Sequence, residues 1–150
     1  MATTKYDAPD FMTRNIFNPI VAFLTKMGLS MRGSRMLGVR GRKSGEWRTT
    51  PVNLLHHDGQ RYLVAPRGET QWARNLRAAG GGELRLGSKK EEFRATELSD
   101  AEKPDIIRAY LKLWKMETGK WFDGVTHESA DADVMRVAGE HPVFLVTAGG

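Results

Sequence analysis

The fold is decided by the stretch RMLGVRGRKSGEWRTTPVNLLHHDGQRYLVAP, residues 35–66. It contains three short runs rich in branched and aromatic residues, separated by the turn GRKSG (residues 41–45) and by the pair Asp58-Gly59. Such runs are typical of β-strands, and an Asp-Gly pair is typical of a tight hairpin. The stretch therefore predicts an antiparallel meander that begins near Ser34.

Turn signals divide the rest of the chain into short elements. ETQWARNLRAA (69–79) predicts a helix ended by the glycines at 80–82, and GELRLG (82–87) and EEFRATEL (91–98) predict a second hairpin. DAEKPDIIRAYLKLWKMETG (100–119) predicts a long helix capped by Ser99 or Asp100, and HPVFLVTA (141–148) predicts a last strand. We expect an α+β fold: about six antiparallel strands in a small barrel, with N-terminal, middle and C-terminal helices.

The N-terminal segment, residues 1–28, has the apolar spacing of a helix. Met12, Ile16, Ile20 and Met27 recur at helical intervals, and Gly28 is placed to end the helix. The apolar stripe is wide, so two interpretations stand. We favour a helix that covers the domain's own core over a helix that lies on a membrane surface.

Composition limits the classes of function. The 150 residues, 40% of them hydrophobic, predict one domain spanning 1–150, and the net charge of +5 favours an anionic partner. There is no cysteine, and the four histidines lack the spacing of a metal cluster, so no metal site is expected. Neither a membrane-spanning run nor a signal sequence is evident, which predicts a cytoplasmic protein.

The GRKSG turn concentrates positive charge. Arg42, Lys43 and Ser44 lie between two glycines that permit close approach of a ligand to the backbone, and Arg48 follows on the next predicted strand. Such a turn suits a phosphate or a carboxylate. The alternative is a solvated hairpin in which the cations only keep an exposed turn polar.

A second constellation lies in APRGETQWARNLRAA, residues 65–79, where a strand leads through a loop into a helix. An anion could sit at the start of this helix, and Trp72 and Asn75 share one helical face that could contact a ring system. Alternatively, Trp72 and Leu76 are simply core contacts. Phosphate-loop, dinucleotide-binding and hydrolase motifs are absent, so any catalysis requires a cofactor.

These segments together resemble a known family. GRKSGEWRTTPV, DGQRYLVAPRG, WARNLRA and ELRLGSKKEEFRA, in this order, are similar to the deazaflavin-dependent nitroreductases, which are actinobacterial split β-barrel oxidoreductases that use reduced coenzyme F-420. The resemblance covers roughly residues 36–96 and the final strand. It implies a split barrel of the FMN-binding, pyridoxamine-oxidase-like type. It also implies hydride delivery to an electron-poor hydrophobic acceptor such as a quinone, an enone or activated alkene, a polycyclic lactone or a nitroaromatic.

The resemblance also implies site residues. The expected cofactor-binding residues are Arg42, Lys43, Ser44, Arg48, Pro51, Asn53, Val64, Ala65, Pro66, Arg67, Gly68, Trp72 and Asn75, with the first four at the phosphate and the oligoglutamate tail. The family loop carries a small hydroxyl residue and a glycine pair where this chain has Pro66-Arg67-Gly68-Glu69. The acceptor pocket is expected at Trp114, Met116, Trp121 and Phe122, and the candidate proton donors are Tyr110, His127 and Ser129.

Other functions remain open from the sequence. An FMN-dependent oxidoreductase of the related barrels shares the phosphate-binding logic, and a noncatalytic cofactor carrier would need the same residues. A basic barrel could bind single-stranded nucleic acid, but the strands carry few aromatic residues beside the charges, so we do not expect a nucleic-acid partner. A monomer or a homodimer is expected, with peripheral contact to the inner face of the cell membrane through the N-terminal helix as a further hypothesis.

Overall fold

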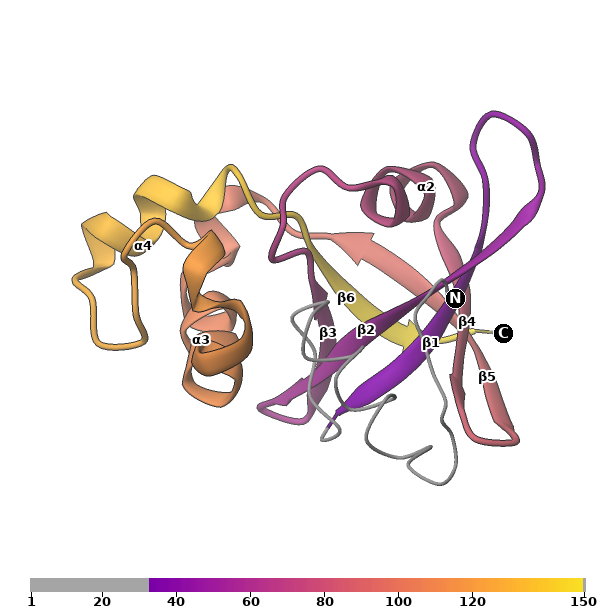
Figure 1. Cartoon of the computed structure of the whole chain (residues 1–150), viewed down its shortest axis with the longest axis horizontal. Coiled ribbons are helices and arrows are strands. Elements are labelled where there is room, and N and C mark those ends of the chain that lie inside the picture. Colours follow the sequence, from indigo (N-terminus) through magenta and orange to yellow (C-terminus); the bar gives the residue numbers. More distant parts are fainter. Residues whose placement is uncertain (1–32, 150) are drawn as a thin grey trace, which may run out of the picture.

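The computed structural model of the chain describes residues 33–149 (Figure 1). The strands are β1 Ser34–Arg40, β2 Trp47–His57, β3 Gln60–Val64, β4 Gly81–Leu86, β5 Lys89–Glu97 and β6 Val143–Ala148. The α-helices are α2 Gln71–Ala79, α3 Pro104–Thr118 and α4 Asp131–Ala138, with 3-10 turns at Asp100–Glu102 and Gly119–Trp121. The helix predicted within residues 1–28 lies outside the described residues.

The six strands form a closed antiparallel barrel in the order β1-β2-β3-β6-β5-β4. The meander β1-β2-β3 is joined to the β4-β5 hairpin on one side by β1 and on the other by the last strand, β6. Closure leaves no strand edge unpaired. The predicted α+β barrel of six antiparallel strands is therefore confirmed.

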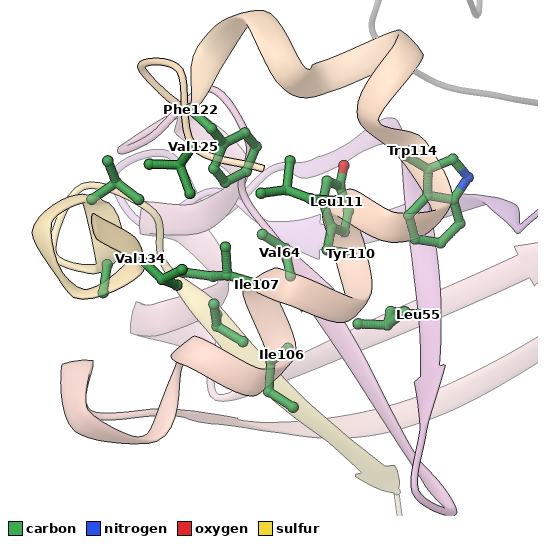
Figure 2. Packing of buried hydrophobic residues seen from close by; sticks show 13 residues of the cluster. Leu55, Val64, Ile106, Ile107, Tyr110, Leu111, Trp114, Phe122, Val125 and Val134 are labelled. Atoms are coloured by element: carbon green, nitrogen blue, oxygen red, sulfur yellow. The ribbon is translucent and has the colours of Figure 1, made fainter. Parts of the chain in front are cut away.

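Two hydrophobic clusters flank strands β2 and β3. Neighbouring residues point to opposite faces of a strand, so Leu54 and Leu63 fill the barrel whereas Leu55 and Val64 face α3 and α4. Figure 2 shows the cluster that faces α3 and α4, in which Tyr110 and Leu111 of α3 lie near Val64. Because both faces of β2 and β3 are buried, these strands read as apolar runs instead of alternating patterns.

The three glycines at 80–82 do not all end α2, as the sequence had suggested. Gly80 alone caps the helix, with a φ of 75° and its N–H donating to the carbonyl of Leu76 at 2.8 Å. Gly81 and Gly82 belong to β4. A Cβ at Gly82 would lie 2.4 Å from the carbonyl oxygen of Gly38, so glycine is needed where β1 and β4 approach closely.

The helical part also differs from expectation in two places. The predicted helix from residue 100 begins instead at Pro104, because Ser99 and Glu102 form a capping box around a separate 3-10 turn. Helix α4 was not predicted, although Val134, Val137 and Ala138 have helical spacing and are buried. Together α3 and α4 lie against one side of the barrel, whereas α2 lies across one end (Figure 1).

Candidate functional site

A cavity of about 420 Å³ opens between β2, α2 and the middle of α3. Its walls come from five segments that are far apart in the sequence. The lining residues are Val39 of β1, Arg48, Thr49, Thr50, Pro51, Val52 and Asn53 of β2, Val64, Pro66, Arg67 and Thr70 at the end of β3 and in the following loop, Gln71, Trp72 and Asn75 of α2, and Tyr110 of α3. This volume lies in the range of small-molecule sites.

Most residues expected to bind the cofactor line this cavity. They are Arg48, Pro51, Asn53, Val64, Pro66, Arg67, Trp72 and Asn75. Ala65 is fully buried in the barrel core, and Gly68 closes a turn by donating its N–H to the carbonyl of Ala65 at 3.1 Å, so these two support the wall from behind. The cavity is also lined by residues that were not expected, namely Val39, Thr49, Thr50, Val52, Thr70 and Gln71. All but Val39 lie within two positions of an expected residue, whereas Val39 reaches the cavity only because β1 pairs with β2.

The basic turn is docked onto α2. The backbone N–H of Arg42 donates to Oδ1 of Asn75 at 3.0 Å, and the Arg42 guanidinium donates to the same oxygen at 2.8 Å and to Gln71 at 3.0 Å. Within the turn, Ser44 Oγ accepts the N–H of Glu46 at 3.1 Å. A hairpin that only keeps its charges solvated needs no such anchor. The fixed position of the basic turn therefore favours a binding role, in which the turn presents Lys43 in a defined place.

Arg42, Lys43 and Ser44 do not line the cavity itself. Arg42 borders a second, more open hollow of about 510 Å³ with Glu69, Arg74, Arg77 and Ala78. Arg77 in this hollow is paired with Glu69 and with Glu97, and both partners are carboxylates. The turn therefore lies beside the cavity and is joined to its wall through Asn75, with Lys43 as its exposed cation.

Two buried polar atoms of the cavity wall have no hydrogen-bond partner among the described residues: Oδ1 of Asn53 and Oγ1 of Thr70. Thr70 precedes α2, yet its side chain makes no capping bond. Leaving a buried polar group without a hydrogen bond costs about 1–3 kcal/mol of folding free energy, so such groups in native proteins usually have a partner. A polar ring ligand in the cavity would supply one, and in this respect the site fits a flavin-like or deazaflavin-like group.

The three candidate proton donors are separated in the structure. Tyr110 lines the cavity and is 1% exposed, and burial raises the pKa of its hydroxyl, which keeps the phenol neutral. His127 and Ser129 lie in the loop before α4 and do not line the cavity. Ser129 Oγ accepts the N–H of Thr126 at 2.8 Å, which assigns it to the loop's own turn.

The residues expected to form the acceptor pocket also separate. Trp114 and Phe122 are 1% and 0% exposed within the helical cluster of Figure 2, where they pack against Tyr110 instead of lining the cavity. Met116 is 94% exposed on α3. Trp121 is half-buried beneath the guanidinium of Arg67 at 5.4 Å, so it supports a residue of the cavity rim.

Within residues 33–149, no three histidine or carboxylate side chains are gathered closely enough to hold a metal ion. In the same part of the chain, no helix combines the length and the apolar character needed to cross a membrane.

A closed antiparallel barrel of six strands with a cavity at its side has the architecture of the split-barrel class of proteins. Residues 20–123 match the sequence model of the family described as F420H(2)-dependent quinone reductase. This match covers more than half of the chain, so the chain belongs to that family. It is an oxidoreductase that depends on the deazaflavin coenzyme F-420, which confirms the resemblance seen in the sequence.

Similar solved structures have the same fold. A protein of unknown function from Agrobacterium tumefaciens is 17% identical with a TM-score of 0.57; the alignment covers 96% of this chain but 60% of that protein's length. An F420-H2 dependent reductase (FDR-A) is 21% identical with a TM-score of 0.52, covering 77% and 95% of the two chains. A putative pyridoxamine 5'-phosphate oxidase from Listeria innocua is 12% identical with a TM-score of 0.52, covering 91% and 95%. No curated protein matches the chain.

Proposed function

We propose that the protein binds reduced coenzyme F-420 in the cavity and uses it to reduce a flat, electron-poor hydrophobic acceptor, with a quinone as the first candidate. The observation that carries this proposal is the pairing of a cavity containing two unpartnered polar atoms with a basic turn docked at its rim. The family match supports the coenzyme, and its quinone-reductase description supports the acceptor class.

The chain's residues divide the work of binding. Arg42, Lys43 and Arg48 hold the coenzyme's phosphate and acidic tail at the rim, where guanidinium groups can make paired hydrogen bonds. Pro51, Val64 and Trp72 supply apolar walls for its ring. When bound, the reduced coenzyme supplies a hydride to an electron-poor carbon or oxygen of the acceptor.

Tyr110 is the expected proton donor that remains at the cavity, but it acts as a neutral hydrogen-bonding group. Burial raises the pKa of its hydroxyl, so loss of its proton to a product anion is unfavourable. We assign the proton that accompanies the hydride to solvent at the open mouth of the cavity. The barrel contributes position and exclusion of bulk water from the ring face.

The test is a titration of the protein with coenzyme F-420 and, separately, with FMN, followed by cofactor fluorescence. We expect selective binding of the deazaflavin and at least tenfold weaker binding by Lys43→Ala, since one charged hydrogen bond contributes about 1.5–3 kcal/mol. Turnover is then measured with menadione and with cyclohexenone as acceptors. Binding of FMN alone would reassign the protein to the sister FMN barrels, and binding without turnover of any acceptor would support a carrier.

The remaining expectations need separate experiments. Peripheral membrane contact is tested by liposome flotation with and without residues 1–28, and equal flotation of both forms, or of neither, counts against it. Sedimentation distinguishes a monomer from a homodimer. Salt-dependent binding to an oligonucleotide would revive the nucleic-acid alternative.

A further inference from the structure

We propose that Asn53 selects the ligand of the cavity by requiring a hydrogen-bond donor on its ring, and that Tyr110 is the positioning residue that fixes the Asn53 amide. The inference rests on the proposed function, because it assigns the donor to the imide N–H of the deazaflavin ring. It gives Tyr110 a role in specificity in place of proton donation.

Asn53 is held in one place by the fold. It lies in the middle of β2, paired with Ser34 of β1, and it is 3% exposed. Its Nδ2 approaches the hydroxyl of Tyr110 at 3.5 Å, a long contact between β2 and α3. Its Oδ1 is buried in the cavity wall and has no partner among the described residues.

The contact with Tyr110 decides which atom of the Asn53 amide is left without a partner. Nδ2 is the amide atom that lies toward Tyr110, and it donates to the phenol oxygen at 3.5 Å. Oδ1 is then the amide atom without a partner among the described residues, so a ligand in the cavity that Asn53 lines would meet a hydrogen-bond acceptor.

Because Oδ1 of Asn53 can only accept a hydrogen bond, it restricts which ligand groups can lie beside it. A quinone offers only carbonyl oxygens, which would meet Oδ1 as one lone pair against another. A deazaflavin offers an imide N–H between two carbonyl groups, and this N–H is the complement of an amide oxygen. A site that leaves a buried polar atom unpaired with the wrong ligand discriminates strongly. Asn53 therefore belongs to the coenzyme's side of the cavity.

The test compares the binding of coenzyme F-420 with that of a derivative methylated at the imide nitrogen, by fluorescence titration without turnover. In the wild type we expect methylation to weaken binding by at least about tenfold, the worth of one hydrogen bond. In Asn53→Ala the ratio of the two dissociation constants falls to within about twofold. In Tyr110→Phe the amide can rotate, so the ratio also falls, by several-fold.

A double variant separates positioning from direct contact. If Tyr110 acts only through Asn53, then Asn53→Ala combined with Tyr110→Phe loses no more discrimination than Asn53→Ala alone. Asn75→Ala is the matched control, since it removes another cavity amide whose Oδ1 already has a partner in Arg42 and should leave the ratio unchanged.

Three outcomes would overturn the inference. A wild type that binds both forms equally well sinks it while leaving the proposed function intact. A wild-type ratio retained in Asn53→Ala, with a changed KM for the quinone only, would assign the amide to the acceptor instead. Failure of the wild type to bind coenzyme F-420 at all would remove the proposed function and this inference together.

Discussion

Replacing Asn75 by alanine should release the basic turn from α2. Its Oδ1 accepts one hydrogen bond from the Arg42 backbone at 3.0 Å and one from the Arg42 guanidinium at 2.8 Å. A neutral bond contributes about 1 kcal/mol and a charged one more, but the turn is partly exposed, so about 2 kcal/mol in total is expected. A turn that is no longer pre-organised would weaken coenzyme binding by up to about thirtyfold.

Asn75→Asp separates geometry from charge. It keeps the oxygen that accepts from Arg42, so the unfolding midpoint should stay close to that of the wild type, whereas Asn75→Ala lowers it by about 4–8 °C. Affinity for the anionic coenzyme should still fall in Asn75→Asp, because a negative charge is added beside the phosphate-binding cations. Gln71→Ala is the control, since it removes a single exposed bond to Arg42.

The assays are thermal unfolding followed by circular dichroism and coenzyme titration followed by fluorescence. The reasoning fails if Asn75→Ala binds coenzyme F-420 within about twofold of the wild type while Lys43→Ala does not. That result would mean that the cations reach the ligand without a docked turn.

Further predictions concern stability. Gly82→Ala should lower the free energy of unfolding by at least about 2 kcal/mol in a denaturant titration, because its Cβ would lie 2.4 Å from the Gly38 carbonyl; an unchanged midpoint would contradict the close approach. Phe122→Ala should cost about 3–5 kcal/mol in the same titration, because it empties a site that is 0% exposed. Burial lowers the pKa of His141 below 6.5, so its contribution to stability is complete above that pH and declines as the pH falls below it. His141→Gln should remove this dependence of stability on pH. The same change at exposed His56 should leave the pH dependence as it is in the wild type.

The sequence predicted the strands well because local chemistry places them. The Asp58-Gly59 hairpin and the turn at Gly87 lie between strands as expected, with Asp58 and both glycines at positive φ. Helix α4 and the break before Pro104 were less predictable. The first is short, and the second depends on the reciprocal capping of Ser99 and Glu102.

The sequence predicted those parts of the candidate site that a local pattern marks, such as clustered charge or helical spacing. It missed the parts that no local pattern marks. The basic turn, Trp72 and Asn75 stood out by charge and by helical spacing, and the structure brings them to one end of the barrel. Trp114 and Phe122 also stood out as large aromatic residues, but the sequence cannot distinguish a pocket wall from a core. The structure buries both of them in the cluster that packs between α3, α4 and the strands β2 and β3.

The sequence by itself determined the elements: strand runs, glycine turns, helix faces and an excess of cations, all of which depend on residues near one another in the chain. Tertiary structure alone decided which of them meet. Closure of the barrel through β6 brings β2 beside α3, and only then does Asn53 meet Tyr110 across 57 positions of sequence. That contact engages the Asn53 Nδ2 and leaves its Oδ1 as an unpaired acceptor, which no pattern in either segment alone predicts.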